Sequence, residues 1–257
     1  MTLVAWGFVA SLLAGGLTAV GALPVLIGRR VSHRLNDVLL GFAAGVMLAA
    51  SFFSLIVPGI EHAEAMYDSA TVAALIAGTG VAIGVAAIAV LNEVLPHEHF
   101  VSGKQGPKSE DVARIWLFVL AITIHNLPEG LAVGVGFGGG DIAKGTTLAI
   151  GIGLQNAPEG LAVALALTTI GYGRLRAFAV AAVTGMVEPV AGLMGAVAVS
   201  LSEFILPWAL TFAAGAMIYV ISHEIIPETH RHGNENAATA GLTVGLVAMM
   251  ILDVALG

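Results

Sequence analysis

Long apolar segments separated by short polar connections fill almost the whole chain. A membrane-spanning helix needs about 20 predominantly apolar residues. Eight segments reach that length, at about 3–27, 37–57, 70–95, 114–137, 145–170, 177–201, 205–224 and 238–256. The pattern predicts an all-α integral membrane protein with eight transmembrane helices. They form a single transmembrane domain over 1–257, surrounded by the lipid bilayer.

The composition agrees with a membrane-embedded chain and narrows its chemistry. Of the 257 residues, 58% are hydrophobic and 11% are charged, whereas a soluble domain carries about 25% charged residues. Cysteine is absent, which excludes disulfides, thiolate metal sites and cysteine nucleophiles. The net charge is -7, and no nucleic-acid partner is expected.

Basic residues mark one side of the predicted bundle. With eight helices, nine of the ten Lys and Arg residues fall in connections on one side, and only Lys144 falls on the other. The nine are Arg29, Arg30, Arg34, Lys104, Lys108, Arg114, Arg174, Arg176 and Arg231. Positively charged connections tend to stay in the cytoplasm. We therefore expect a multi-pass protein of the cell membrane (the inner membrane in a bacterium) with both termini outside.

The outer connections of this arrangement are acidic. They carry Glu61, Glu64, Asp68, Asp141 and Glu203. A surface of one charge sign raises the local concentration of counter-ions. The outer face is therefore suited to gathering cations.

A short motif occurs twice within the apolar sequence. Residues 125–134 read HNLPEGLAVG and residues 155–164 read QNAPEGLAVA. His125 and Glu129 are four residues apart and share a helix face, as do Gln155 and Glu159. A proline inside each motif removes one backbone hydrogen bond. Carboxylates in a membrane need partners, so the repeat indicates a bound cation between two antiparallel helices.

Further polar residues lie near the two motifs. Asn126 and Asn156 follow His125 and Gln155, and Glu188 precedes a proline in the sixth apolar segment. Two divalent cations would carry +4 against -3 from the three carboxylates. One divalent cation would leave an excess negative charge, and a proton would then bind in place of the second cation. Nitrogen and oxygen ligands without sulfur suit zinc, manganese, iron or cobalt. The alternative is that these side chains only join helices by hydrogen bonds.

A second repeat relates the two ends of the chain. FAAGVM at 42–47 matches FAAGAM at 212–217, and a proline follows each about ten residues later. The two helices that carry them run in opposite directions. The match predicts an inverted repeat of helices 1–3 and 6–8, as in many secondary transporters. The alternative is a chance match in sequence rich in Ala and Gly.

The two P-E-G motifs and the eight-helix arrangement resemble the ZIP family of divalent-metal transporters, in particular its bacterial, GufA-like branch. The resemblance implies a binuclear centre. His125, Glu129, Gln155 and Glu159 would form one site. The second site would use Asn126, Asn156 and Glu188, with Glu129 and Glu159 bridging the two ions. Family members often carry Asp where this chain has Asn156. The resemblance also favours a homodimer.

The resemblance further implies an entrance and an exit for the metal. The entrance would lie near Met47, Ser54 and Glu61, and the exit near His223 and Glu224. Relatives can carry an acidic residue at the end of helix 3, where this chain has Asn92 followed by Glu93. Loop residues that would collect or sense metal are His97, Glu98, His99, Glu228, His230 and His232. The alternative is that these loop residues are simply solvated.

These observations predict a transporter that moves divalent metal ions into the cytoplasm. Zinc is the first candidate cargo, followed by iron, manganese, cobalt and cadmium. An intramembrane metallohydrolase is the alternative from another class, because zinc and a nearby glutamate can activate water. The HExxH motif is absent, however, and Pro227 stands where its second histidine would follow His223. We expect no enzymatic activity. An exporter remains the closer alternative, since ligands do not encode direction.

Overall fold

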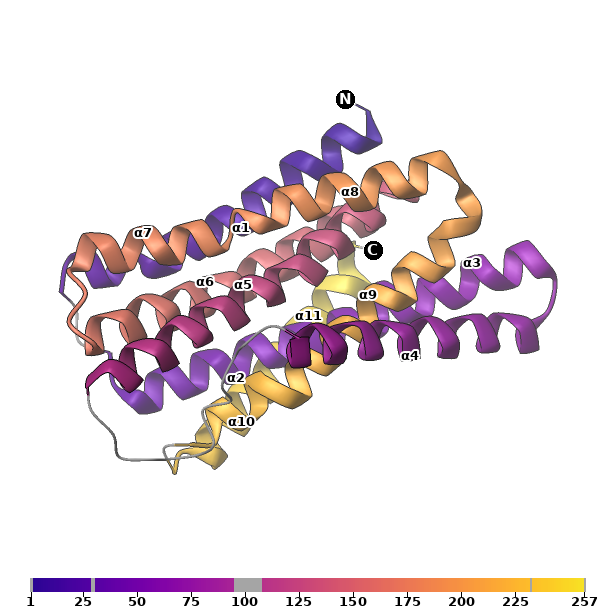
Figure 1. Ribbon diagram of the computed structural model, residues 1–257. Coiled ribbons are helices and arrows are strands. Elements are labelled where there is room, and N and C mark those ends of the chain that lie inside the picture. The colour runs from indigo at the N-terminus through magenta and orange to yellow at the C-terminus, as the bar shows by residue number, and fades with distance from the viewer. Residues whose placement is uncertain (1, 29–30, 95–107, 232, 257) are drawn as a thin grey trace.

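The structure is a computed structural model that describes residues 2–28, 31–94, 108–231 and 233–256. Its described part consists of helices and contains no strand (Figure 1). The α-helices are α1 (Leu3–Leu26), α2 (His33–Ala49), α3 (Val57–Tyr67), α4 (Ala70–Val94), α5 (Lys108–Gly138), α6 (Ile142–Thr169), α7 (Arg174–Thr184), α8 (Val187–Leu201), α9 (Leu206–Val220), α10 (Ile226–Thr229) and α11 (Glu235–Leu256). Two π-helical segments, η1 (Ala50–Ile56) and η3 (Ile221–Ile225), and one 3-10 helix, η2 (Glu203–Ile205), complete them.

Seven helical stretches of the described chain are long and apolar enough to cross a membrane. They are Leu3–Leu26, His33–Tyr67, Ala70–Glu93, Ile142–Thr169, Arg174–Leu201, Glu203–Thr229 and Glu235–Leu256. These stretches coincide with seven of the eight predicted segments. The eighth, at about 114–137, lies within α5, and several of its side chains lie outside the described part. The predicted all-α membrane bundle is confirmed.

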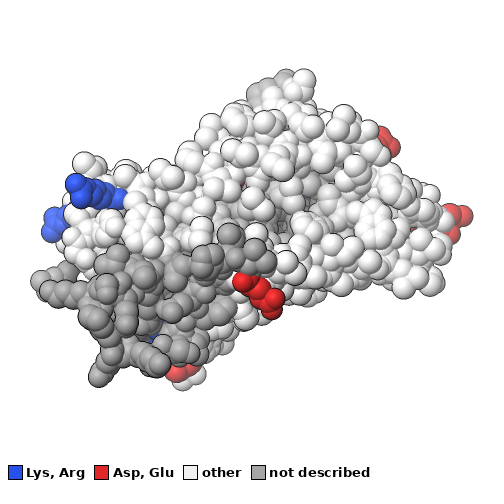
Figure 2. All heavy atoms as spheres, viewed as in Figure 1, with Lys and Arg blue, Asp and Glu red and all other residues white. Residues whose placement is uncertain are grey.

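The connections between helices gather at two opposite ends of the bundle. The α3–α4, α5–α6 and α8–α9 connections lie at one end, and the α1–α2, α6–α7 and α10–α11 connections lie at the other (Figure 1). Among the described basic residues, Arg34, Arg174, Arg176 and Arg231 belong to the second end and Lys144 to the first. The Lys and Arg atoms visible in Figure 2 accordingly lie at its left end. The structure therefore reproduces the predicted separation of charge, and the orientation in the membrane stays a prediction.

The helices pack as two groups. One group contains α1, α5, α6, α7 and α8, and the other contains α2, α3, α4, α9 and α11. In the first group α1 packs against α6, and α5 packs against α8. In the second group α2 packs against α11, and α9 packs against α4. Exchanging α1 for α8, α2 for α9, α4 for α11 and α5 for α6 reproduces each of these pairs, which agrees with the predicted inverted repeat.

Backbone contacts at glycine show the same symmetry. A Cβ added to Gly15 would meet the carbonyl of Gly185, and one added to Gly185 would meet the carbonyl of Gly15. Within the second group, Gly45 of α2 lies against the backbone of α11, and Gly84 of α4 lies against the backbone of α9. Such contacts let backbones approach closely in lipid, where small residues favour helix association. The reciprocal Gly15–Gly185 contact places a pseudo-two-fold axis between α1 and the α7–α8 junction.

The two π-helical segments occupy equivalent places in the repeat. One follows the motif at 42–47 and begins at Ala50, and the other follows the motif at 212–217 and begins at Ile221. Pro58 and Pro227 stand in the first turn of the α-helices that come next. Proline has no N–H, so the carbonyls four residues earlier, those of Ser54 and His223, lose their α-helical donors. Wider π turns at these two places are a local consequence, and such turns often mark functional sites.

Several boundaries differ from the predictions. The second helix was predicted at 37–57, but the helical chain continues from His33 to Tyr67 through η1 and α3. The sixth, predicted as unbroken over 177–201, is interrupted between α7 and α8. Pro189 cannot donate to the carbonyl of Gly185, which explains the break. Between the predicted segments at about 70–95 and 114–137, residues 108–113 are helical, and 95–107 lie outside the described residues.

Candidate metal centre

The seven predicted ligands come from three helices of the first group. His125, Asn126 and Glu129 lie on α5, and Gln155, Asn156 and Glu159 lie on α6. Glu188 lies in the first turn of α8, directly after the helix break. All seven side chains are buried, each with an exposed fraction of 2% or less. Both motif helices remain α-helical through their prolines, Pro128 and Pro158.

Glycine brings the two motifs close to their neighbours. A Cβ added to Gly130 would meet the backbone of Glu188 on α8, and one added to Gly160 would meet the backbone of Thr18 on α1. The glycine of each P-E-G motif therefore packs against one of two helices, α8 and α1, that the inverted repeat relates to each other.

One hydrogen bond joins α5 to α6 inside the centre. Gln155 Nε2 donates to Glu129 Oε1 at 2.6 Å. Within the described residues, Glu129 Oε2 and Gln155 Oε1 have no hydrogen-bond partner. Each side chain thus has one hydrogen-bonded atom, Gln155 Nε2 or Glu129 Oε1, and one oxygen without a partner.

Glu159 has the least satisfied carboxylate of the centre. Neither of its oxygens accepts a hydrogen bond from the described part of the chain, although the side chain is only 1% exposed. Its charge interacts with His125, and the charge of Glu129 interacts with Glu159 and Glu188. Buried polar atoms are normally hydrogen-bonded, and unpaired ones call for an explanation. A cation held between these side chains would supply the missing partner.

Asn156 links three helices. Its Nδ2 donates to the carbonyl of Ala14 on α1 at 2.9 Å and to Glu188 Oε1 on α8 at 2.7 Å. Among the residues that the structure describes, Glu188 Oε2, Asn156 Oδ1 and Asn126 Nδ2 have no hydrogen-bond partner. The second predicted set of ligands is therefore partly engaged in bonds within the protein.

His125 contacts the second helix group. Its Nε2 lies 2.9 Å from Glu224 Oε2 of η3, and the Glu224 side chain is 15% exposed. The geometry of this contact is that of an ion pair rather than an aligned hydrogen bond, and Nδ1 has no partner in the described structure. A predicted ligand and a predicted exit residue are thus in direct contact.

In this arrangement no three His, Asp or Glu side chains of the described chain are placed to hold one metal ion by themselves. Two of the carboxylates, those of Glu129 and Glu188, instead accept hydrogen bonds from the amides of Gln155 and Asn156. A cation would therefore need amide oxygens or small side-chain movements to complete its coordination. Oxygen and imidazole donors without sulfur fit divalent ions such as zinc.

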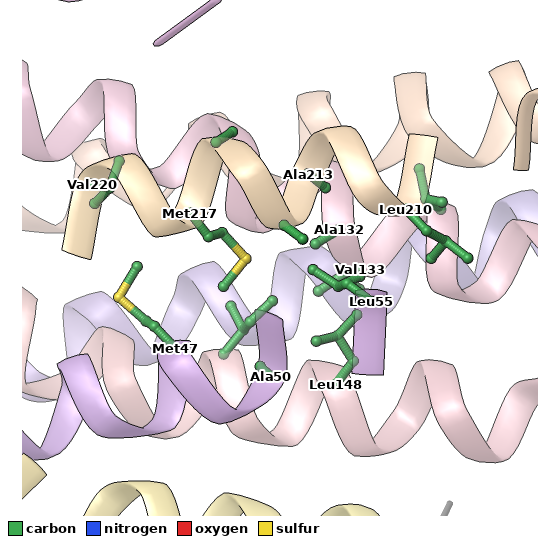
Figure 3. Close-up of a cluster of buried hydrophobic side chains, with 14 of the residues drawn as sticks. Met47, Ala50, Leu55, Ala132, Val133, Leu148, Leu210, Ala213, Met217 and Val220 are labelled. Carbon is green, nitrogen blue, oxygen red and sulfur yellow. The ribbon is translucent and has the colours of Figure 1, made fainter. Parts of the chain in front are cut away.

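The predicted entrance residues, Met47, Ser54 and Glu61, lie seven residues apart along one helical stretch, His33–Tyr67. Met47 is 1% exposed and lies in an apolar cluster with Leu55, Val133 and Met217 (Figure 3). Ser54, farther along the same helical stretch, donates to Asp253 Oδ1 of α11 at 2.6 Å. Glu61 is exposed on α3.

Glu61 and Lys144 form a loose surface ion pair, with Oε2 and Nζ 3.6 Å apart. Asp253 was not predicted from the sequence. The available signal was its position as the single carboxylate of the last apolar segment, at about 238–256.

The predicted exit residues partly converge at the opposite end. The rings of Tyr219 and His223 have centroids 4.8 Å apart, and Asn92 Nδ2 donates to the Tyr219 hydroxyl at 3.1 Å. Asn92 of α4 therefore contacts the predicted exit helix through Tyr219, a residue that was not predicted from the sequence. Glu93, next to Asn92, is exposed.

The predicted metal-collecting residues have local partners where the structure describes them. Glu228 Oε2 pairs with Arg231 at 2.9 Å, and His230 Nδ1 lies 2.8 Å from the carbonyl of Ile226. These contacts are within one turn of the chain. The remaining members of that prediction, His97, Glu98, His99 and His232, lie outside the described residues.

Comparison with known proteins places the chain among metal transporters. The family model described as ZIP Zinc transporter matches residues 96–253. Zinc transporter GufA of Myxococcus xanthus is 47% identical over 251 residues, which cover 98% of this chain and 99% of that protein. Zinc transporter ZIPB of Bordetella bronchiseptica is 49% identical over 240 residues, covering 93% and 78%. Zinc transporter ZIP11 of Homo sapiens is 38% identical, covering 94% of each chain. The chain therefore belongs to the ZIP zinc transporter family.

Proposed function

We propose that the protein carries divalent metal ions, with zinc as the main cargo, across the membrane through the centre between α5 and α6. The observation that carries the proposal is the set of buried carboxylate oxygens without donors in the described structure, on Glu129, Glu159 and Glu188. Charged groups inside a membrane are costly unless paired, and they mark ion pathways. The names of the relatives, all zinc transporters, support the same function.

His125, Glu129, Gln155 and Glu159 are the proposed ligands. They lie on facing helices and provide one imidazole, two carboxylates and an amide oxygen. Two carboxylates balance the charge of one divalent ion. Iron, manganese, cobalt and cadmium are further candidate cargoes, since the same donor types bind them. Asn126, Asn156 and Glu188 lie beside this set.

The proposed route runs between the two helix groups. A cation enters from the acidic end near Ser54 and passes the apolar cluster that contains Met47. It binds between α5 and α6 and leaves toward Glu224 and His223 on η3. The inverted repeat favours a rigid-body movement of one group against the other. A gated channel would use the same ligands.

The proposed setting follows from the distribution of charge. The protein lies in the cell membrane with both termini outside, so that the basic end faces the cytoplasm. Transport is then inward. The family resemblance supports a homodimer. No enzymatic activity is proposed, because the relatives are named as transporters and a hydrolytic zinc site requires an open coordination position for water.

Zinc uptake into proteoliposomes that contain a zinc-sensitive dye tests the function. Wild type should give saturable uptake, and Glu159→Gln should remove it, because the amide keeps the shape of the side chain and loses its charge. Glu203→Gln is the matched control, since Glu203 is exposed on η2. Equal uptake by wild type and Glu159→Gln would overturn the proposal. Loading the ion on either side in turn distinguishes import from export.

A further inference from the structure

We propose that the membrane core of this protein binds one divalent cation rather than two, because Asn156 holds Glu188 in a hydrogen bond at the place of the second ion. The inference rests on the proposed function and concerns the same centre. The family resemblance implies a second ion held by Asn126, Asn156 and Glu188. Asn156 Nδ2 and Glu188 Oε1 are used in hydrogen bonds within the protein, so this pair offers that ion only the neutral amide oxygen of Asn156 and one oxygen of Glu188.

The orientation of the Asn156 amide is fixed by its surroundings. A backbone carbonyl can only accept hydrogen bonds, so the amide nitrogen, not the oxygen, must face Ala14. The same nitrogen donates to Glu188 Oε1. Both N–H groups of the amide are therefore used. Turning the amide over would lose two hydrogen bonds and would set its oxygen against two acceptors.

The two acceptors cannot easily withdraw. Ala14 precedes Gly15, whose backbone is in contact with Gly185 at the α7–α8 junction. The backbone of Glu188 is in contact with Gly130 of α5. Closely packed interiors respond to displacement as a unit. Asn156 is thus held between two backbone positions that are themselves fixed.

Gln155, by contrast, can become a ligand. Its Nε2 makes one hydrogen bond, to Glu129 Oε1, and its Oε1 has no partner in the described structure. No backbone carbonyl dictates the orientation of this amide. The terminal torsion of glutamine is broad and nearly two-fold. Rotation about it would turn Oε1 toward a cation at the loss of a single bond, whereas Asn156 Oδ1, which also has no partner in the described structure, stays where the two bonds of its amide nitrogen hold it.

Charge alone does not determine the number of ions. Glu129, Glu159 and Glu188 leave a net charge of -1 with one divalent cation and +1 with two. An aspartate at 156 would bring four negative charges, which two cations would balance. It would also lack the N–H donors that hold Glu188. Asn156 is therefore the residue that selects a single ion.

The number of zinc ions bound to the purified protein tests this inference. Equilibrium dialysis followed by elemental analysis gives zinc per chain. The double variant Glu129→Gln/Glu159→Gln supplies the background from sites outside the membrane core. After subtraction we expect one ion for wild type, one for Glu188→Gln and two for Asn156→Asp. Glutamine at 188 keeps an oxygen that accepts from Asn156, so the first site should be undisturbed.

Each outcome separates the two proposals. Two ions above background in wild type would overturn the single-ion inference and leave the transport site in place. One ion in wild type and none in Glu188→Gln would overturn the role given to the Asn156–Glu188 bond, because Glu188 would then be a ligand of the bound ion. No ion above background in wild type would overturn the proposed metal centre itself. If Asn156→Asp fails to fold, wild type and Glu188→Gln still decide the number of ions.

Discussion

His125 on α5 and Glu224 on η3 meet across the boundary between the two helix groups, with Nε2 and Oε2 2.9 Å apart. His125 is a proposed ligand of the metal centre, and Glu224 lies in a π-helical segment that leads toward the basic end of the bundle. A cation that leaves His125 therefore finds a carboxylate within reach of the same imidazole. The contact joins the proposed binding site to the proposed exit without an intervening residue.

Glu224→Gln should slow transport while preserving metal binding. Glutamine keeps the size of the side chain and its ability to contact His125, but it removes the charge that would receive the cation. We expect the maximal rate of zinc uptake to fall roughly tenfold, which corresponds to about 1.4 kcal/mol in the barrier. Uptake into proteoliposomes gives the rate, and dialysis gives the number of bound ions.

Glu228→Gln is the control for this prediction. Glu228 lies one turn farther along the same helical stretch and pairs with Arg231. Its replacement makes the same chemical change away from the centre and should leave the rate within twofold of wild type. Similar losses in both variants would mean that negative charge at this end, rather than the contact with His125, governs the rate.

Adjacent glycines on α1 test the packing at the pseudo-two-fold axis. Gly15→Ala would drive a methyl group against the carbonyl of Gly185, whereas nothing lies within 4 Å of a Cβ at Gly16. Overpacking costs about 1–3 kcal/mol, so the free energy of unfolding should fall by that amount for Gly15→Ala. Gly16→Ala should leave it equal or raise it by up to about 1 kcal/mol, because alanine favours the helix. Denaturant unfolding in detergent measures both, and equal effects would contradict the contact.

The ligands that could be predicted from sequence share local spacing. His125 and Glu129 fall on one helix face because they are four residues apart, and Gln155 and Glu159 repeat that spacing. The two motifs also identify each other, since both contain N-x-P-E-G-L-A-V, with an offset of 30 residues. These relationships need only helix geometry. The burial of all four side chains follows from the same pattern.

The features that could not be predicted depend on residues far apart in the chain. Asn156 bonds the carbonyl of Ala14 at a separation of 142 residues, and Ser54 bonds Asp253 at a separation of 199. A hydrogen bond to a backbone carbonyl cannot be recognised from the sequence, because every residue has such a carbonyl. The break before Glu188 likewise falls within an unbroken apolar run. It coincides with the missing N–H of Pro189 and with the backbone contact between Gly185 and Gly15 of α1.

Paired cysteines across the group boundary distinguish a moving carrier from a gated channel. A Cβ at Gly139, after α5, would lie 3.1 Å from the side chain of Leu206, at the start of α9 in the other group. The described chain has no cysteine that would interfere. Cross-linking Gly139→Cys with Leu206→Cys should abolish zinc uptake if the groups move as rigid bodies, and reduction should restore it. Uptake is measured in proteoliposomes before and after cross-linking.

The matched control pair lies within one group. A Cβ at Gly138 would lie 3.1 Å from Cβ of Val199 on α8, which moves together with α5 in a rigid-body mechanism. Cross-linking Gly138→Cys with Val199→Cys should therefore leave most of the uptake intact. Retained uptake in both cross-linked pairs would favour a channel whose gates move locally.

Asp253→Asn should weaken the capture of metal from the acidic end. Asp253 accepts from Ser54 at 2.6 Å, and asparagine can still accept through its oxygen, so the change removes charge and keeps the bond. A carboxylate on the approach raises the local cation concentration. We expect the KM for zinc to rise several-fold, up to roughly tenfold, with little change in maximal rate, since one elementary charge near a protein surface contributes on the order of 1 kcal/mol or more. Asp68→Asn removes the same charge from an exposed position at the same end. Equal rises in KM for the two variants would assign the effect to the overall acidity of that face rather than to the position beside Ser54.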